Sequence, residues 1–397
     1  PAEKLKKVGD IEKELKFCKT SKDVAILEGV IGQDRAVKSM EFGLSMNAPG
    51  YNIFVLGPQG TGKSTYTKSV VSKLASKGIV PNDWCYINNF SEWDKPLAIS
   101  LPPGKGKEFQ KDMDKLIVNL TVYIPKAFEG SNFQQQKDSI VQSVNKKMSS
   151  LLRETEKIAS DAGFGIQQSG QRILLIPLKD NRLITQEEYN ALDAATREEI
   201  DSKRTKLASE IDERIRDSQA IQRKAEEQAM ELEKQTAYKA AEPLVSQLKE
   251  KYKDIDEIVS YLEKVLKDAA ENHSIFTNNM SILGNEIAAE GQQNPDSEDE
   301  DNIFDTKLLE TKDSKNPFTR YKVNLFINNE NTQGSPVVEE SNPYYYNLFG
   351  KIEYKSHMMT TITDFTMIKP GALQKANGGY LILQAKDLLM DPYAWDA

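Results

Sequence analysis

The stretch GPQGTGKS (Gly57–Ser64) decides the fold class of this 397-residue chain. It matches the pattern G-x-x-x-x-G-K-[ST] of phosphate-binding loops in full. The apolar run YNIFVL at 51–56 precedes it and predicts a buried parallel strand, and a helical pattern continues from the loop to Gly78. A strand, a glycine-rich loop and a helix in this order predict an α/β nucleotide-binding core, here called the P-loop core.

The loop's residue types explain how it would hold a nucleotide. Glycines let backbone N–H groups wrap phosphates at the positive end of the following helix. Lys63 is expected to reach the β- and γ-phosphates, and Ser64 is expected to ligate Mg²⁺. The predicted cofactors are therefore ATP or ADP with Mg²⁺. The candidate nucleotide ligands are Gly57, Pro58, Gln59, Gly60, Thr61, Gly62, Lys63, Ser64 and Thr65.

Composition narrows the possible partners and compartment. A net charge of −8 gives no general support for nucleic-acid binding. Two cysteines, Cys18 and Cys85, and two histidines, His273 and His357, do not suffice for a disulfide framework or a zinc site. No apolar run is long enough to span a bilayer, so we expect a cytoplasmic protein without a membrane partner. The way the chain starts, at Pro1, and stops suggests a piece of a longer protein.

The middle of the chain predicts a long helical region. It is rich in Lys, Glu and Gln, and neither Gly nor Pro occurs between Arg182 and Glu242. The sequence TQEE (Thr185–Glu188) predicts a capped helix start, and GFGIQQSGQRILLIPL (163–178) predicts a hairpin with Ser169-Gly170 at its turn. An apolar stripe on a charged helix suggests a partial coiled coil. Its members are Ile200, Leu207, Ile211, Ile215, Ile221 and Ala225.

Four segments follow from these patterns. Residues 1–106 form the first part of the P-loop core, and 107–276 form a helical insertion that is either a solvated spacer or an arm contacting a partner. Residues 277–316 contain the acidic run EGQQNPDSEDEDNIFD and predict a disordered linker. Residues 317–397 return to strand-like patterns and complete the core. The predicted class is α/β with a mostly α-helical, partly coiled-coil insertion that contains a small β-hairpin.

Two short segments resemble motifs of the AAA+ ATPases. VIGQDRA (30–36) is similar to the box that lies beside the adenine, which implies Ile31, Gly32 and Gln33 as further nucleotide contacts. GALQKANGGYLILQ (371–384) is similar to the second nucleotide motif, a strand that ends in Asp-Glu.

In this chain Gln384 and Ala385 occupy the positions of that Asp-Glu pair. Gln offers Mg²⁺ only a neutral carbonyl and Ala cannot orient water, so slow hydrolysis is expected. The nearest carboxylate, Asp387, is expected beyond the strand end. The candidate metal ligands are Ser64, Gln384 and Asp387.

Five segments together resemble the ATPase part of the Lon-related ATP-dependent proteases. They are WCYINNF (84–90), NENTQGSPVV (329–338), NPYYYNLFGKIEY (342–354), TDFTMIKPGALQKANGGYLIL (363–383) and DLLMDPYAWDA (387–397). The resemblance implies an AAA+ core, a homohexameric ring, and ATP-driven delivery of unfolded or damaged protein to a Ser–Lys peptidase domain. That domain is expected outside this sequence, so no catalytic residue is assigned.

Members of this family commonly carry Asp-Ala-Arg-Asp where this chain has Gln384 to Asp387, so the loss of the first aspartate is a departure. The resemblance also suggests that Tyr354, Met358, Met359 and Phe365 grip substrate in the ring pore. Ordinary strand and core positions would look the same.

Two other functions remain open. A nucleotide-gated chaperone or scaffold that does not hydrolyse ATP fits Gln384 and Ala385. A DNA-organising ATPase with a coiled coil between its two nucleotide motifs has a similar layout. That class carries Ser-Gly-Gly before the second strand, whereas this chain has KANGG, and its acidic balance also argues against DNA.

Overall fold

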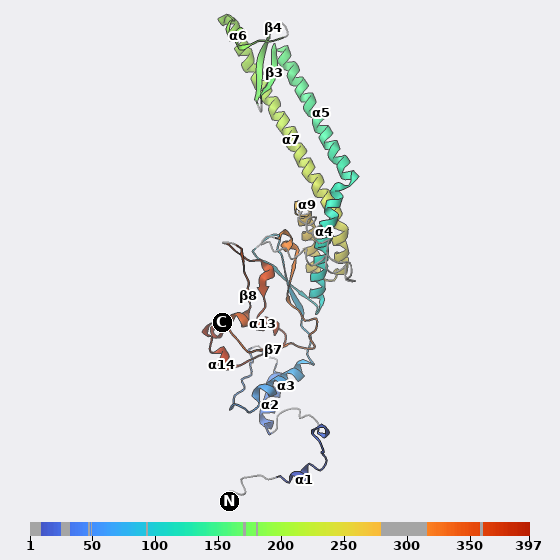
Figure 1. Ribbon diagram of the computed structural model, residues 1–397, viewed down its shortest axis with the longest axis vertical. Coiled ribbons are helices and arrows are strands. Elements are labelled where there is room, and N and C mark those ends of the chain that lie inside the picture. Colours follow the sequence, from blue (N-terminus) through green and yellow to red (C-terminus); the bar gives the residue numbers. More distant parts are fainter. Residues whose placement is uncertain are drawn as a thin grey trace, which may run out of the picture. The chain divides into compact units, whose positions relative to one another are not determined.

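A computed structural model divides the chain into two compact units (Figure 1). Unit 1 comprises Pro1–Tyr86, Ala98–Glu108 and Asn324–Ala397, and unit 2 comprises Ile87–Leu97 and Phe109–Val323. Among the described helices, none is long and apolar enough to cross a membrane. The structure describes residues 9–24, 32–46, 48, 50–92, 94–169, 172–179, 182–278, 316–357 and 360–397. The acidic run at 290–305 lies outside them.

Unit 1 contains short helices and several small sheets. Its described helices are α1 (Ile11–Glu14), α2 (Asp34–Ser45), α3 (Lys63–Ala75), α12 (Tyr345–Phe349), α13 (Ala372–Lys375), α14 (Ala385–Leu388) and α15 (Pro392–Asp396). The strands pair in the orders β2-β1-β6, β12-β7, β11-β8 and β10-β9. Their bounds are β1 (Asp83–Ile87), β2 (Leu97–Leu101), β6 (Val323–Ile327), β7 (Val337–Glu340), β8 (Lys351–Ile352), β9 (Lys355–His357), β10 (Thr360–Ile362), β11 (Ile368–Lys369) and β12 (Tyr380–Leu383). The predicted strand YLIL is thus confirmed.

The parallel pair β7–β12 depends on the two glycines that precede β12. A side chain at Gly379 would place its Cβ 2.0 Å from the carbonyl oxygen of Pro336, and Gly378 has a φ of +78°. The chain can therefore enter the ladder only without side chains at these positions. Beyond them, Leu381 and Leu383 pack against a small apolar cluster centred on Leu348.

A buried carboxylate fixes the start of β1. Asp83 is 0% exposed, and its two oxygens accept hydrogen bonds from the backbone N–H groups of Asn329 at 2.7 Å and Gly106 at 2.9 Å. These bonds connect β1 to the loop after β6 and to the start of α4 (Lys105–Glu129). Buried carboxylates need such donors, because an unpaired charge in the interior is very costly.

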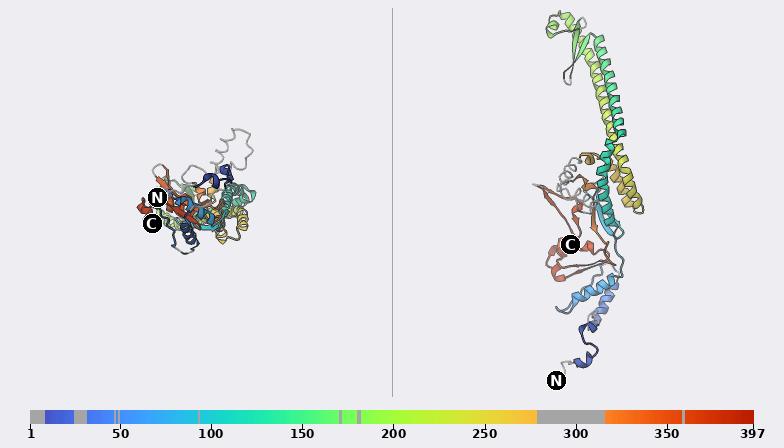
Figure 2. Two further views of the ribbon diagram at one scale, coloured as in Figure 1. Left: turned by 90° about the horizontal axis from the view of Figure 1, so that it is seen from below. Right: turned by 45° about the vertical axis from the view of Figure 1, so that its right-hand side comes forward.

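Unit 2 is a helical assembly, as the composition predicts. Helices α5 (Ser131–Asp161) and α7 (Ala194–Lys251) run side by side, with the hairpin of β3 (Phe164–Ser169) and β4 (Arg172–Lys179) at their far end (Figures 1 and 2). The remaining described elements are β5 (Arg182–Leu183), α6 (Gln186–Asn190), α8 (Asp256–Glu271), α9 (Ser274–Asn278) and the 3-10 turn Pro317–Tyr321.

The apolar stripe of α7 has the predicted role over part of its length. Leu207 and Ile211 are buried against Ala159 of α5 and Phe164 of β3, and Ile200 and Ile215 flank them. Predicted local details of unit 2 are also present. The backbone N–H of Thr185 donates to Glu188 at 2.9 Å and the N–H of Glu188 donates to the Thr185 hydroxyl at 3.3 Å, which is the reciprocal capping box.

The structure confirms the predicted hairpin but corrects the residues of its turn. Ser169 pairs with Arg172 and therefore ends β3 instead of belonging to the turn. Gly170 lies outside the described residues.

The predicted strand at 51–56 is wrong. These residues join no ladder among the described strands, and the side chains of Phe54 and Leu56 are 73% and 84% exposed. A lone extended segment gains nothing from its apolar residues without a neighbouring strand to cover them. Ile53 does contact α2, since a Cβ added at Gly43 would lie 3.0 Å from its Cδ1, but its side chain is still 38% exposed.

Candidate nucleotide-binding site

The P-loop leads directly into α3, as predicted. Gly60 and Gly62 both have a φ of +78°, and no atom lies within 4 Å of the place where a Cβ would stand. Gly62 is the residue that precedes the first helical residue, Lys63. The turn therefore needs glycine for its backbone conformation, and the open side of the loop leaves room for a ligand to approach the backbone.

Lys63 folds back over the loop. Its ammonium donates to the carbonyl oxygens of Gly57 at 2.8 Å and Pro58 at 2.5 Å, and the Thr61 hydroxyl also donates to the Pro58 carbonyl at 2.9 Å. The positive charge thus lies within the loop, at the positive end of a helix whose first turn carries no acidic residue. Both features favour an anion at this position, so the residues present fit a phosphate.

Helix α3 also contacts the parallel pair β7–β12. Lys68 of α3 forms an ion pair with Glu339 of β7 at 2.7 Å. Ser64 and Lys68 are one helical turn apart and share a face of α3. Glu339 is aligned with Ile382 of β12, and alternation along a strand puts Gln384 on the same side as Ile382. The first turns of α3 therefore lie near the end of β12.

The three candidate metal ligands differ in position. Ser64 is exposed in the first turn of α3, and Gln384 is exposed directly after β12. Asp387 is half-buried in α14, which confirms that it lies beyond the strand end. In the part of the chain that the structure describes, no group of three His, Cys, Asp or Glu residues could hold a metal ion. A Mg²⁺ ion here would depend mainly on nucleotide phosphates and Ser64, without the strand-end carboxylate that ATPases commonly add to these ligands.

The candidate adenine contacts lie at the start of α2. Gly32 has a φ of +73°, Gln33 precedes the first residue of α2, and Ile31 lies outside the described residues. Partial burial and the negative charge of Glu41 in α2 raise the pKa of Tyr66 in α3. The role of Gly32 and Gln33 beside a base stays a prediction.

Two family models match parts of the chain. The LonB-like AAA domain matches residues 333–397, and the Lon-like LonC helical domain matches residues 83–116. These two matches support a Lon-related protein with an AAA module. No curated protein matches the chain. The AAA match includes β7, β12, Gln384 and Asp387, whereas the P-loop lies outside both matches and rests on its motif and geometry.

One element of the site was not predicted from the sequence. The exposed ion pair Lys68–Glu339 links α3 to β7, and neither residue belongs to a sequence motif. The available signal was the pair of glutamates, Glu339 and Glu340, at the end of the segment VVEE. The position of Glu339 beside the end of β12 depends on the parallel pairing of β7 with β12, which the local sequence does not specify.

Proposed function

We propose that this Lon-related chain binds ATP or ADP with Mg²⁺ through Gly57–Thr65. Lys63 would exchange the loop carbonyls for the β- and γ-phosphates, and Ser64 would ligate the metal. The observation that supports this best is the complete loop, with two positive-φ glycines and an inward lysine, at the start of a 13-residue helix. Gly32 and Gln33 are proposed to lie beside the base.

As an AAA module, the chain would use the nucleotide to act on other proteins. We propose that it forms a homohexameric ring that moves unfolded or damaged polypeptides to a Lon-type Ser–Lys peptidase domain, in the cytoplasm. The matches to LonB-like and LonC models support this role. Of the proposed pore residues, Tyr354 is 63% exposed, Phe365 begins a 3-10 turn, and Met358 and Met359 lie outside the described residues.

The ending of β12 favours a second candidate function. Gln384 and Ala385 supply neither a carboxylate for the metal nor one for water, and Asp387 lies in the following helix. Such a site would bind nucleotide and turn it over slowly. A nucleotide-gated chaperone or scaffold would need binding alone.

Nucleotide binding can be tested by thermal unfolding with and without ADP. We expect millimolar ADP to raise the melting temperature of the chain, because a ligand at 100 times its Kd stabilises the bound fold by about 2.7 kcal/mol. Lys63→Ala should abolish the shift. Lys73→Ala, which removes an exposed lysine from the last turn of the same helix, should keep it. An unchanged melting curve of the native chain would exclude the P-loop assignment.

Hydrolysis needs a separate measurement of phosphate release. Gln384→Asp restores the carboxylate at the end of β12, and we expect it to raise turnover about tenfold while ADP affinity stays similar. Asp387→Ala should leave turnover unchanged. Fast turnover that depends on Asp387 and not on Gln384 would show that the second motif is misplaced.

A further inference from the structure

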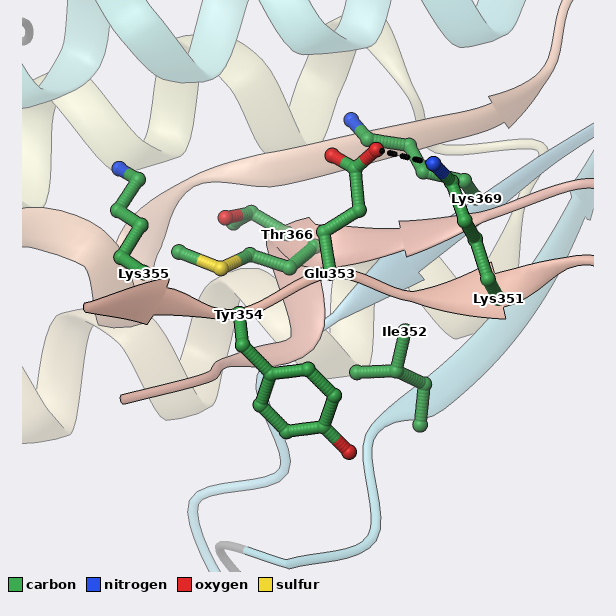
Figure 3. Close-up of a pocket in the computed structure, with 8 residues that line it drawn as sticks. Lys351, Ile352, Glu353, Tyr354, Lys355, Thr366 and Lys369 are labelled. Atoms are coloured by element: carbon green, nitrogen blue, oxygen red, sulfur yellow. Dashed lines mark ion pairs between the residues drawn. The ribbon is translucent and has the colours of Figure 1, made fainter. Parts of the chain in front are cut away.

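A basic groove lies in unit 1, away from the P-loop residues. It has a volume of about 600 Å³ and is formed by β8, β9, β11 and the turn Phe365–Met367 (Figure 3). Its charged residues are Lys351, Glu353, Lys355 and Lys369. Three lysines against one glutamate leave an excess of positive charge in a chain whose net charge is −8.

The placement of two of these lysines is unfavourable for the sheet. Lys351 and Lys369 stand directly opposite each other in the antiparallel ladder β8–β11. Like charges at such positions destabilise a strand pair. Lys351 is compensated by Glu353 at 3.0 Å, but among the described residues Lys355 and Lys369 have no ion-pair partner. A bound anion would relieve this repulsion.

The groove has a linear pattern of charge. Lys351, Glu353 and Lys355 project to one side of their segment, and Ile352 and Tyr354 project to the other (Figure 3). At about 3.3 Å per residue, Lys351 and Lys355 lie about 13 Å apart, with a carboxylate midway. This span is too long for a single phosphate or carboxylate group, but it matches two side chains on one face of an extended peptide.

The backbone of the segment is already engaged. The N–H of Glu353 donates to the carbonyl of Met367 at 2.9 Å, and its carbonyl accepts from the Thr363 hydroxyl at 2.8 Å. On the remaining wall, the Thr366 hydroxyl and N–H both donate to Asp364. Recognition in this groove would therefore come from the lysine side chains and not from strand addition.

We propose that this groove binds extended acidic segments of polypeptide. The preferred ligand has two carboxylates four residues apart, which meet Lys355 and the Lys351–Lys369 pair, and a neutral or basic residue between them, opposite Glu353. Nucleic acid fits this pattern less well, because a continuous row of phosphates would place negative charge against Glu353. The proposal builds on the proposed function, since it gives that function's protein substrate a chemical preference.

Fluorescence anisotropy without nucleotide tests the pattern. The probe is a labelled peptide with the core Glu-Ser-Lys-Ser-Glu flanked by Ser and Gly, and the matched probe is an isomer with both glutamates adjacent. We expect the spaced peptide to bind about fivefold more tightly than its isomer, with an affinity that falls as salt rises. Equal binding of the two isomers, or no binding of either, would overturn the proposal.

Variants then assign the binding to the groove. Lys369→Gln and Lys355→Gln should each weaken binding of the spaced peptide about fivefold, and Lys375→Gln, at an exposed lysine of α13, should not. Glu353→Gln should strengthen binding of the peptide Glu-Ser-Glu-Ser-Glu, in which a third glutamate replaces the central lysine, because the variant removes the carboxylate opposite that residue. Single-stranded oligonucleotide that binds more tightly than the peptide and depends on the same lysines would replace the peptide proposal. Lys63→Ala should bind peptide normally, so failure of the groove and failure of the nucleotide site are distinguishable.

Discussion

The two units of the chain are stabilised in different ways. In unit 2, α8 buries seven residues, among them Leu262 and Val265 with 0% exposure. In unit 1, the P-loop helix α3 buries only Val71 and Ala75, and the apolar run before the loop lies largely exposed. Apolar burial is the main favourable term in folding, so the helical unit contains much of its own stabilisation and the nucleotide-binding elements contain little.

The P-loop is held in place by few contacts. Its conformation comes from left-handed glycines, from Lys63 bonded to the loop's own carbonyls, and from one exposed ion pair. Each of these is worth little by itself, and segments with few buried contacts open first. A ligand that joins the loop then contributes a large share of local stability, which is the physical basis of the thermal-shift experiment.

The largest expected effect comes from replacing one leucine with alanine in each of the two units. Leu262→Ala should lower the free energy of unfolding by about 3 kcal/mol, because it empties a fully buried site in α8. Leu56→Ala removes the same atoms from a side chain that is 84% exposed and should change stability by less than about 0.5 kcal/mol. Chemical denaturation of both variants, followed by circular dichroism, measures the contrast.

The prediction would be contradicted if Leu56→Ala lowered the free energy of unfolding as much as Leu262→Ala. Such a result would mean that the run at 51–56 is covered in solution, as its sequence pattern predicts.

The next largest effect concerns the buried carboxylate that holds the start of β1 in unit 1. Asp83→Ala leaves the N–H groups of Asn329 and Gly106 without their acceptor, and we expect a loss of about 2 kcal/mol. Asn82→Ala, which removes only an exposed bond from Nδ2 to the Ser100 hydroxyl, is the control and should cost less than about 0.5 kcal/mol. Equal losses for both substitutions would show that the buried carboxylate has no special role.

Elements with strong local signals could be predicted from the sequence. The capping box at Thr185–Glu188, the hairpin after Gly163 and the start of α3 at Lys63 all depend on residues close in sequence, and the structure confirms them. The stripe of α7 was also predictable, because helical periodicity places Leu207 and Ile211 on one face.

Features that depend on distant pairing could not be predicted in this way. YNIFVL and YLIL look equally strand-like, yet only YLIL finds a partner, because Gly379 admits it beside Pro336 and β7. The pair Lys68–Glu339 joins residues 271 positions apart, and local pattern gives no sign of it. At the candidate site, the motif residues were therefore predictable and their connection to the sheet was not.

The smallest expected effect tests that connection. Lys68 and Glu339 have side chains 61% and 45% exposed, so solvent screens their attraction, and either Lys68→Ala or Glu339→Gln should cost at most about 0.5 kcal/mol of stability. ADP affinity should fall about twofold to threefold in each variant, because the pair orients α3, which carries Ser64 one turn earlier. In the double variant the loss should be no greater than in either single variant, since both remove the same tether. Calorimetric titration of ADP into the four proteins measures this cycle, and independent, additive losses would mean that the two charges act on the nucleotide separately and that the ion pair does not position the loop.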